Sequence, residues 1–171
     1  MAETLVNWFI STFSFLTTSE SGKGLLVFII SLLPILELRG GLIAASLLKL
    51  GLVKSFIITF IGTIIPVPFI LLFIKKVIEW MGKTKRLSKI SEWLNKKAEK
   101  NKPKIDKYGF WGLVLFVGIP LPGTGAWTGS LVAGLFEMDF KKSLLAVFIG
   151  CLLASIIMMI FSYGVLGNII G

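Results

Sequence analysis

Long apolar runs, with charges confined to short stretches between them, dominate the pattern along this chain. Two runs, 55–74 and 143–165, contain no Lys, Arg, Asp or Glu. Each is long enough for a helix to cross ~30 Å of hydrocarbon. The chain offers no amphipathic helices that could bury two such segments in a soluble core. The pattern therefore predicts an all-α integral membrane protein in which residues 1–171 form a single membrane domain.

The two halves of the chain resemble each other at a fixed offset of 88 positions, with 24–73 aligned to 112–161 and fourteen of fifty pairs identical. Chance matching between leucine-rich segments would explain some Leu and Ile pairs, but less readily the Pro, Gly and Lys-Ser pairs. We therefore expect a repeat, with unit one at about 24–74 and unit two at about 112–165. The informative pairs are Gly24/Gly112, Pro34/Pro122, Gly41/Gly129, Lys54/Lys142, Ser55/Ser143 and Gly62/Gly150.

In each unit, Pro and Gly interrupt the first apolar stretch, at 34–41 in unit one and at 120–129 in unit two. Pro removes a backbone donor and Gly permits sharp bends, so each stretch should form two half-helices. A half-helix of about ten residues reaches only ~15 Å. It could enter the membrane to its midplane and turn back. Pro66 and Pro68 predict a kink or a partial break in the following span.

The behaviour of the broken stretches decides the topology. If they are re-entrant hairpins, each unit crosses the membrane once and the units have opposite orientations; if they cross fully, the units are parallel. We favour two inverted repeats, each a re-entrant helical hairpin followed by a transmembrane helix, because this design recurs in transporters. Residues 1–17 lack the features of a signal peptide, and we expect an interfacial helix or the start of a tilted one.

Positive charge is concentrated between the units, where 75–107 holds twelve of the eighteen Lys and Arg residues and four of the nine acids. This placement indicates a cytoplasmic loop of a multi-pass protein of the cytoplasmic membrane. It suits anionic lipid headgroups rather than nucleic acid. The linker 75–109 is expected to contain a basic amphipathic helix that lies on the inner membrane surface, or a solvated helix packed on the protein. Its apolar positions are Leu87, Ile90, Leu94 and Ala98.

Composition also excludes several chemistries. The chain has no His, and its one cysteine, Cys151, lies within an apolar span. Disulfide, zinc and catalytic-triad chemistries are therefore unsupported, and we expect no cofactor, no metal and no enzyme activity. A phosphate-binding GxxxxGK[ST] loop is also missing from the sequence, so ATP hydrolysis is not expected.

Glu37 and Arg39 are the only charged residues between Lys23 and Lys49, and they lie at the break of unit one. Charges at membrane depth cost about 2.5–3.5 kcal/mol each and usually mark function. Arg39 stays protonated and needs an anion, either a substrate phosphate or carboxylate or Glu37 itself. Burial favours the neutral form of a carboxyl group, which makes Glu37 a candidate proton carrier. The structural alternative is a Glu–Arg pair that pins the hairpin.

The break of unit two contains small and hydroxyl residues in place of charges. Its glycines expose backbone N–H groups, and the following half-helix points its N-terminus at the break, which favours anions. The alternative is a turn that needs small residues for close packing. The predicted substrate and coupling residues are Pro34, Glu37, Arg39, Gly40, Pro120, Pro122, Gly123, Thr124, Gly125, Trp127 and Thr128.

At these residues the chain resembles a known family. The runs LLPILELRGGLIAA and FVGIPLPGTGAWTGSLVAG, together with the basic linker, are similar to the small multidrug export family of bacterial and archaeal membrane proteins, over about 24–165. That family is similar to the DedA (SNARE-associated/VTT) superfamily, in which some relatives flip undecaprenyl phosphate and eukaryotic relatives scramble phospholipids. The resemblance implies two facing re-entrant hairpins and a midplane site lined by Glu37, Arg39 and the turn 122–125. The second break departs from the DedA pattern, because it lacks the arginine common there.

These features together predict a transporter or flippase for a small or lipid-linked substrate with an anionic phosphate headgroup, with proton coupling through Glu37. A cationic amphipathic drug is the alternative substrate, and it would need Glu37 exposed and unpaired. A lipid-phosphate enzyme, a non-transporting scaffold and a channel are further alternatives. We expect membrane lipids as partners, and a homodimer, since a chain with so few spans would not readily enclose a cavity alone.

Overall fold

The computed structural model describes residues 2–83, 89, 92, 107–121 and 123–165, and every regular element in this part of the chain is helical. The all-α prediction is thereby confirmed for these residues. The basic linker helix lies outside the described residues, apart from Lys89 and Glu92. The elements are α1 (Ala2–Thr12), the 3₁₀ helix η1 (Ser14–Thr18), α2 (Glu20–Leu32), α3 (Glu37–Leu47), α4 (Leu52–Ile64), α5 (Pro66–Lys83), the helical segment 107–118, α7 (Ala126–Leu135), α8 (Phe140–Met159) and the π-helix η2 (Ile160–Val165).

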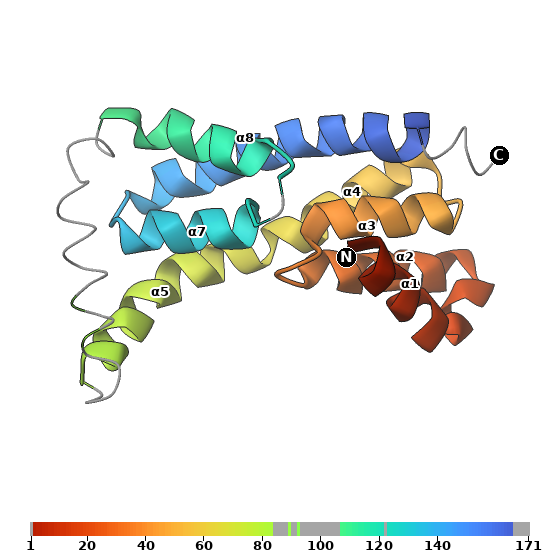
Figure 1. The fold of residues 1–171 in the computed structure, drawn as a ribbon, viewed down its shortest axis with the longest axis horizontal. Helices are drawn as coiled ribbons and strands as arrows, with labels where there is room; N and C mark the ends of the chain where they lie inside the picture. Colours follow the sequence, from red (N-terminus) through yellow and green to blue (C-terminus); the bar gives the residue numbers. More distant parts are fainter. Residues whose placement is uncertain (1, 84–88, 90–91, 93–106, 122, 166–171) are drawn as a thin grey trace.

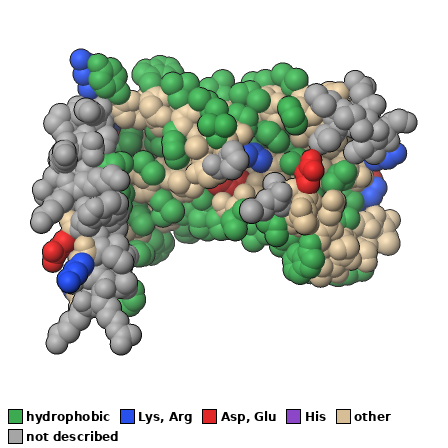
Figure 2. All heavy atoms as spheres, in the orientation of Figure 1, with side chains coloured by type: hydrophobic (Ala, Val, Ile, Leu, Met, Phe, Trp, Pro, Cys, Tyr) green, Lys and Arg blue, Asp and Glu red, His purple; other side chains and the backbone are tan. Residues whose placement is uncertain are grey.

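Two helical stretches, Leu52–Ile74 and Phe140–Gly164, are long and apolar enough to cross a membrane. The first joins α4 to α5 with a one-residue interruption at Ile65, before Pro66, where the sequence predicts a kink. Both stretches present large apolar side chains to the outside, among them Ile57, Phe69 and Ile156. Apolar side chains cover much of the middle of the face shown in Figure 2. An exposed apolar surface of this extent suits lipid better than water.

Two helical hairpins accompany these spans. The residues 33–36 join α2 to α3, and the two helices pack together. The residues 119–125 join the segment 107–118 to α7, and a Cβ on Gly129 of α7 would meet Val117 at 2.5 Å. With 10 to 13 residues, α2, α3 and α7 are about 15–20 Å long, which is short of the ~30 Å hydrocarbon thickness.

The hairpins are arranged around the centre of the molecule. Helices α3 and α7 both begin near the centre and run toward opposite ends, and the path α4–α5 runs oppositely to α8 (Figure 1). The re-entrant and inverted arrangement also depends on how the chain sits in a membrane, so it stays a prediction.

The sequence repeat has a counterpart in the backbone. Each hairpin ends in a residue with left-handed backbone, Lys49 with φ 55° and Glu137 with φ 53°, which lie 88 positions apart. The N–H of the next residue donates to a carbonyl five positions back in both units, at 3.0 Å from Leu50 to Ala45 and at 2.9 Å from Met138 to Ala133.

The core has two parts. The first is formed within unit one by α2 and α3 and includes Val6 of α1, so the N-terminal helix packs on the first hairpin. The second joins α3 to α5 and to unit two, because Leu38 and Leu42 are buried with residues of α5, α7, α8 and the segment 107–118. The start of α3 is therefore the place where the two units meet.

Close helix packing within unit one depends on Gly62. A Cβ at this position would lie 2.9 Å from Ser31 Cβ and 3.1 Å from the Phe28 carbonyl oxygen. We expect Gly62→Ala to lower the free energy of unfolding by about 1–3 kcal/mol, measured by thermal unfolding in detergent. Gly51→Ala is the control, because a Cβ there meets nothing within 4 Å. Equal stability of the two variants would contradict this account of the packing.

Candidate functional site

The break of unit one is a short turn. The N–H of Glu37 donates to the Leu33 carbonyl at 2.9 Å, and the N–H of Gly40 donates to the Leu36 carbonyl at 2.8 Å. Helix α3 thus begins at Glu37, and the predicted extent of the break, 34–41, is wrong at its second boundary.

The glycines of this stretch serve packing. Gly40 and Gly41 lie inside α3, where a Cβ on Gly40 would lie 2.6 Å from Leu36 Cβ and one on Gly41 would lie 2.7 Å from Thr59 Cγ2. Gly40 therefore allows the close approach of Leu36 from the preceding turn, and its part in a binding site stays a prediction.

Glu37 is held at the first residue of α3 and is only 5% exposed. Its carboxylate accepts hydrogen bonds from the backbone N–H groups of Ala126, at 3.1 Å, and Trp127, at 2.9 Å. These are the first two residues of α7, whose N–H groups have no partner within the helix. Gly125, at the N-cap position, has no side chain to cap them. Glu37 supplies the missing cap, and its negative charge meets the positive end of the helix.

The backbone of Glu37 is strained. Its φ is 47°, in the left-handed region that residues other than glycine rarely adopt. Strain of this kind costs on the order of 1–3 kcal/mol and persists where the surroundings over-determine the geometry. Here the bonds to α7 hold the residue in place.

Arg39 binds the other side of the same break. Its guanidinium donates to the carbonyls of Ile119, at 3.4 Å, Leu121 and Thr124, and to the Thr124 hydroxyl at 3.2 Å. Ile119 and Leu121 follow the end of the helical segment 107–118. These two carbonyls also accept hydrogen bonds within the turn, from the N–H groups of Leu121 and Thr124, and the cation gives them a further, charged donor. The Arg39 cation thus binds the turn that follows the segment 107–118, and the Glu37 anion binds the beginning of α7.

We call these contacts of Glu37 and Arg39 with residues 119–127 the charge junction. Glu37 and Arg39, which are both described, form no ion pair with each other within 4.0 Å. The alternative of a Glu–Arg pair is therefore wrong about the partner: both charges pin hairpin one, but to hairpin two.

The break of unit two is shaped for this contact. A Cβ on Gly125 would overlap the Glu37 carboxylate, so only glycine allows the close approach. Gly123 has φ 83°, a conformation that glycine adopts without strain. The Thr124 hydroxyl lies 2.9 Å from the Ile119 carbonyl oxygen and closes the turn from within.

The other predicted residues lie around this centre. Pro34 is exposed on the turn of hairpin one, Pro120 is partly buried, and Pro122 lies outside the described residues. Thr128 lies within α7 and is partly buried. The indole N–H of Trp127 is buried and has no hydrogen-bond partner among the described residues.

The structure thus brings together Glu37, Arg39, Thr124, Gly125 and Trp127. The partners that sequence interpretation missed are the carbonyls of Ile119 and Leu121 and the N–H of Ala126. No side-chain pattern could have revealed them, because they are backbone groups. Only the position of these residues at a Pro- and Gly-rich break hinted that their backbone groups could bind side chains.

We expect Gly125→Ala to expel the Glu37 carboxylate from the junction, because the new Cβ would occupy its place. Unpairing a buried charged group should lower the free energy of unfolding by about 1–3 kcal/mol. Hydrogen exchange of the Ala126 and Trp127 amides should accelerate about tenfold or more. Gly112→Ala is the control, because a Cβ there meets nothing within 4 Å. Unchanged exchange at Ala126 and Trp127 in the first variant would show that Glu37 does not protect them.

A known protein family covers the residues on both sides of the charge junction. The family model described as "Putative small multi-drug export protein" matches residues 37–157, from the first residue of α3 almost to the end of α8. Neither a curated protein nor a solved structure matches the chain. The relationship to the DedA superfamily stays a prediction. The match spans well over half of the chain and both sides of the charge junction, and the chain therefore belongs to this family of small multidrug export membrane proteins.

Proposed function

We propose that this chain is a transporter or flippase whose charge junction controls a path near the middle of the membrane. Family membership and the two apolar spans support membrane transport in general. The observation that carries the specific proposal is the binding of Glu37 and Arg39 to opposite sides of one break. Both charged side chains form hydrogen bonds with which a substrate or a proton can compete.

In the proposed topology, the hairpins α2–α3 and 107–118/α7 enter the membrane from opposite faces. Their half-helices are too short to span, and α3 and α7 both begin near the centre of the molecule (Figure 1). The protein would then be an inverted repeat in the cytoplasmic membrane, with the basic segment 75–107 on the cytoplasmic side.

Proton binding to Glu37 would loosen the junction. The ionised carboxylate accepts from two N–H groups and is favoured by the positive end of α7. Protonation removes the charge and turns one oxygen into a donor, which is a poor partner for an N–H group. Release of Glu37 would also relieve its strained backbone. Protonation and separation of α3 from α7 would therefore favour each other.

The substrate that best suits the released site is an amphipathic anion with a phosphate headgroup. Once Glu37 leaves, the N–H groups of Ala126 and Trp127 can receive a phosphate oxygen, and Arg39 is close enough to the same break to pair with it. Ile35, which is 76% exposed, and Leu121 provide apolar surface beside these groups. A cationic drug is disfavoured in the described state, because the Glu37 carboxylate is buried and already bound.

Proteoliposomes under a pH gradient test the proposal with a fluorescent polyprenyl phosphate and, separately, a cationic dye. We expect Glu37→Gln to abolish the dependence on the pH gradient and Arg39→Ala to slow phosphate-lipid transport at least about tenfold, the effect of losing ~1.4 kcal/mol. Glu3→Gln is the charge control, because Glu3 is exposed near the beginning of α1 and lies outside the charge junction.

Parental transport rates in both junction variants would refute the proposal. Transport of the dye in place of the lipid phosphate would favour the drug-export alternative. A silent assay combined with a retained protein partner would favour a scaffold.

A further inference from the structure

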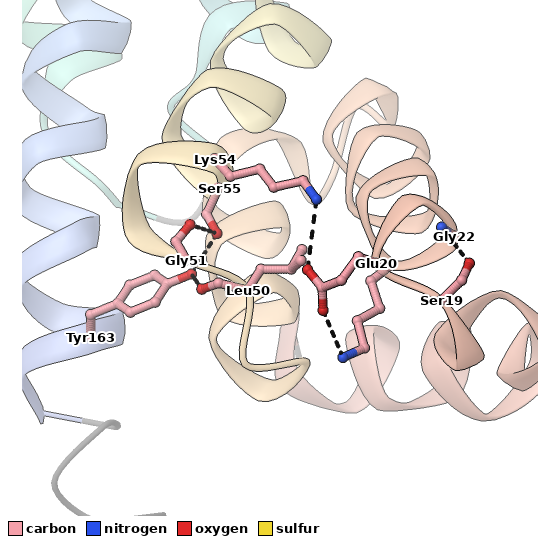
Figure 3. A network of polar contacts seen from close by, with 9 residues as sticks. Ser19, Glu20, Gly22, Leu50, Gly51, Lys54, Ser55 and Tyr163 are labelled. Carbon is pink, nitrogen blue, oxygen red and sulfur yellow. Dashed lines mark hydrogen bonds and ion pairs between the residues drawn. The ribbon is translucent and has the colours of Figure 1, made fainter.

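A second contact joins the two units far from the charge junction. The Ser46 hydroxyl, at the end of α3, donates to the Ser162 carbonyl at 2.8 Å. The Tyr163 hydroxyl lies 3.0 Å from the Leu50 carbonyl oxygen and 2.6 Å from Ser55 Oγ, at the start of α4 (Figure 3). Ser162 and Tyr163 belong to η2, so the end of unit two's long helix closes against the end of hairpin one.

The same pair of positions meets at the opposite end of the molecule. Shifting Ser46 and Ser162 by 88 positions gives Gly134 in α7 and Ile74 in α5. A Cβ on Gly134 would overlap the Ile74 side chain, so these residues are in close contact. Each hairpin thus touches the long helix of the other unit through equivalent residues.

The two equivalent contacts differ in chemistry. At one end α7 packs on α5, and at the other end α3 packs on α8 and on its continuation η2. In the first contact, Gly134 lies directly against the apolar Ile74 side chain. The second contact contains the hydrogen bonds of Ser46 and Tyr163, whose net contribution is small because each replaces another.

The hydrogen-bonded contact also contains local irregularities. A single π-helical stretch in a long helix is rare and often occurs at functional sites, and η2 is such a stretch. The Ser162 side chain is 0% exposed, and its hydroxyl has no hydrogen-bond partner among the described residues. A buried hydroxyl without a partner is costly. An arrangement in which it meets water would relieve this cost.

We propose that the contact of Ser46, Leu50 and Ser55 with Ser162 and Tyr163 is a gate that opens while the α5–α7 contact remains closed. It lies at the end of the molecule away from the end of α5 (Figure 1). The beginning of α4 stays with hairpin one when the gate opens, because Lys54 of α4 and Lys23 of α2 both pair with Glu20 (Figure 3). The role of the gate rests on the proposed transport function, but its opening can be measured without substrate.

A buried reporter cysteine can measure gate opening. Ser162→Cys removes no hydrogen bond of the side chain, and the Ser162 carbonyl still accepts from Ser46. The native Cys151 is buried and is replaced by alanine in all variants. The labelling rate of Cys at 162 by a water-soluble maleimide is measured in lipid nanodiscs, where both faces of the membrane are accessible.

We expect Tyr163→Phe and Ser46→Ala each to raise the labelling rate about 2- to 10-fold, as loss of one hydrogen bond would allow. Tyr108→Phe is the matched control, because Tyr108 is the only other tyrosine of the chain and is exposed in the segment 107–118. Circular dichroism confirms that the variants keep their helices.

Equal labelling rates in the Tyr163, Ser46 and Tyr108 variants would overturn the gate. So would a rate in the parent as fast as that of the exposed control Gly51→Cys. If the labelling rate responds to the variants but the protein moves neither lipid phosphate nor dye, the gate is supported and the transport function is refuted. If transport is normal but the labelling rate does not respond, the gate is refuted and the transport function is supported.

Discussion

The bond between a buried carboxylate and the beginning of a distant helix is the interaction on which this structure depends. Helix α7 begins inside the protein, and its first N–H groups have neither a capping side chain nor a preceding turn to satisfy them. Glu37 provides both the acceptor and the opposing charge. A buried carboxylate and a buried helix end are each unfavourable alone, but they stabilise each other when brought together.

The asymmetry between the two units follows from the same constraint. The turn of hairpin one is short, and its backbone groups are satisfied by helical hydrogen bonds from Glu37 and Gly40. The turn of hairpin two is longer, and it presents carbonyls on one side and the first N–H groups of α7 on the other. Hairpin one supplies a cation to the carbonyls and an anion to the N–H groups. Gly125 occupies the position equivalent to Glu37, and it must be small because the carboxylate of Glu37 fills the space beside it.

Family membership gives this arrangement a functional meaning. A protein that moves a substrate needs an interface that holds in one state and separates in another. The charge junction holds the beginnings of α3 and α7 together at the centre, while the contacts at Ser162 and at Gly134 join each hairpin to the long helix of the other unit at the two ends. Strained backbone at Glu37 and an unpartnered hydroxyl at Ser162 lie at two of these three places, which is where stored strain would assist a change of state.

The sequence by itself determined the helical class, the two apolar spans, the repeat of 88 positions and the two charges at the first break. These properties depend on hydrophobic pattern and on residue identity, which are local and visible along the chain. Only the tertiary structure decided where the charges bind. Their partners are backbone groups of Ile119, Leu121, Ala126 and Trp127, and every residue carries such groups, so no residue type marks them. The packing role of Gly40 and Gly41 was likewise hidden, because a glycine required for a bend and a glycine required for close contact look the same in a sequence.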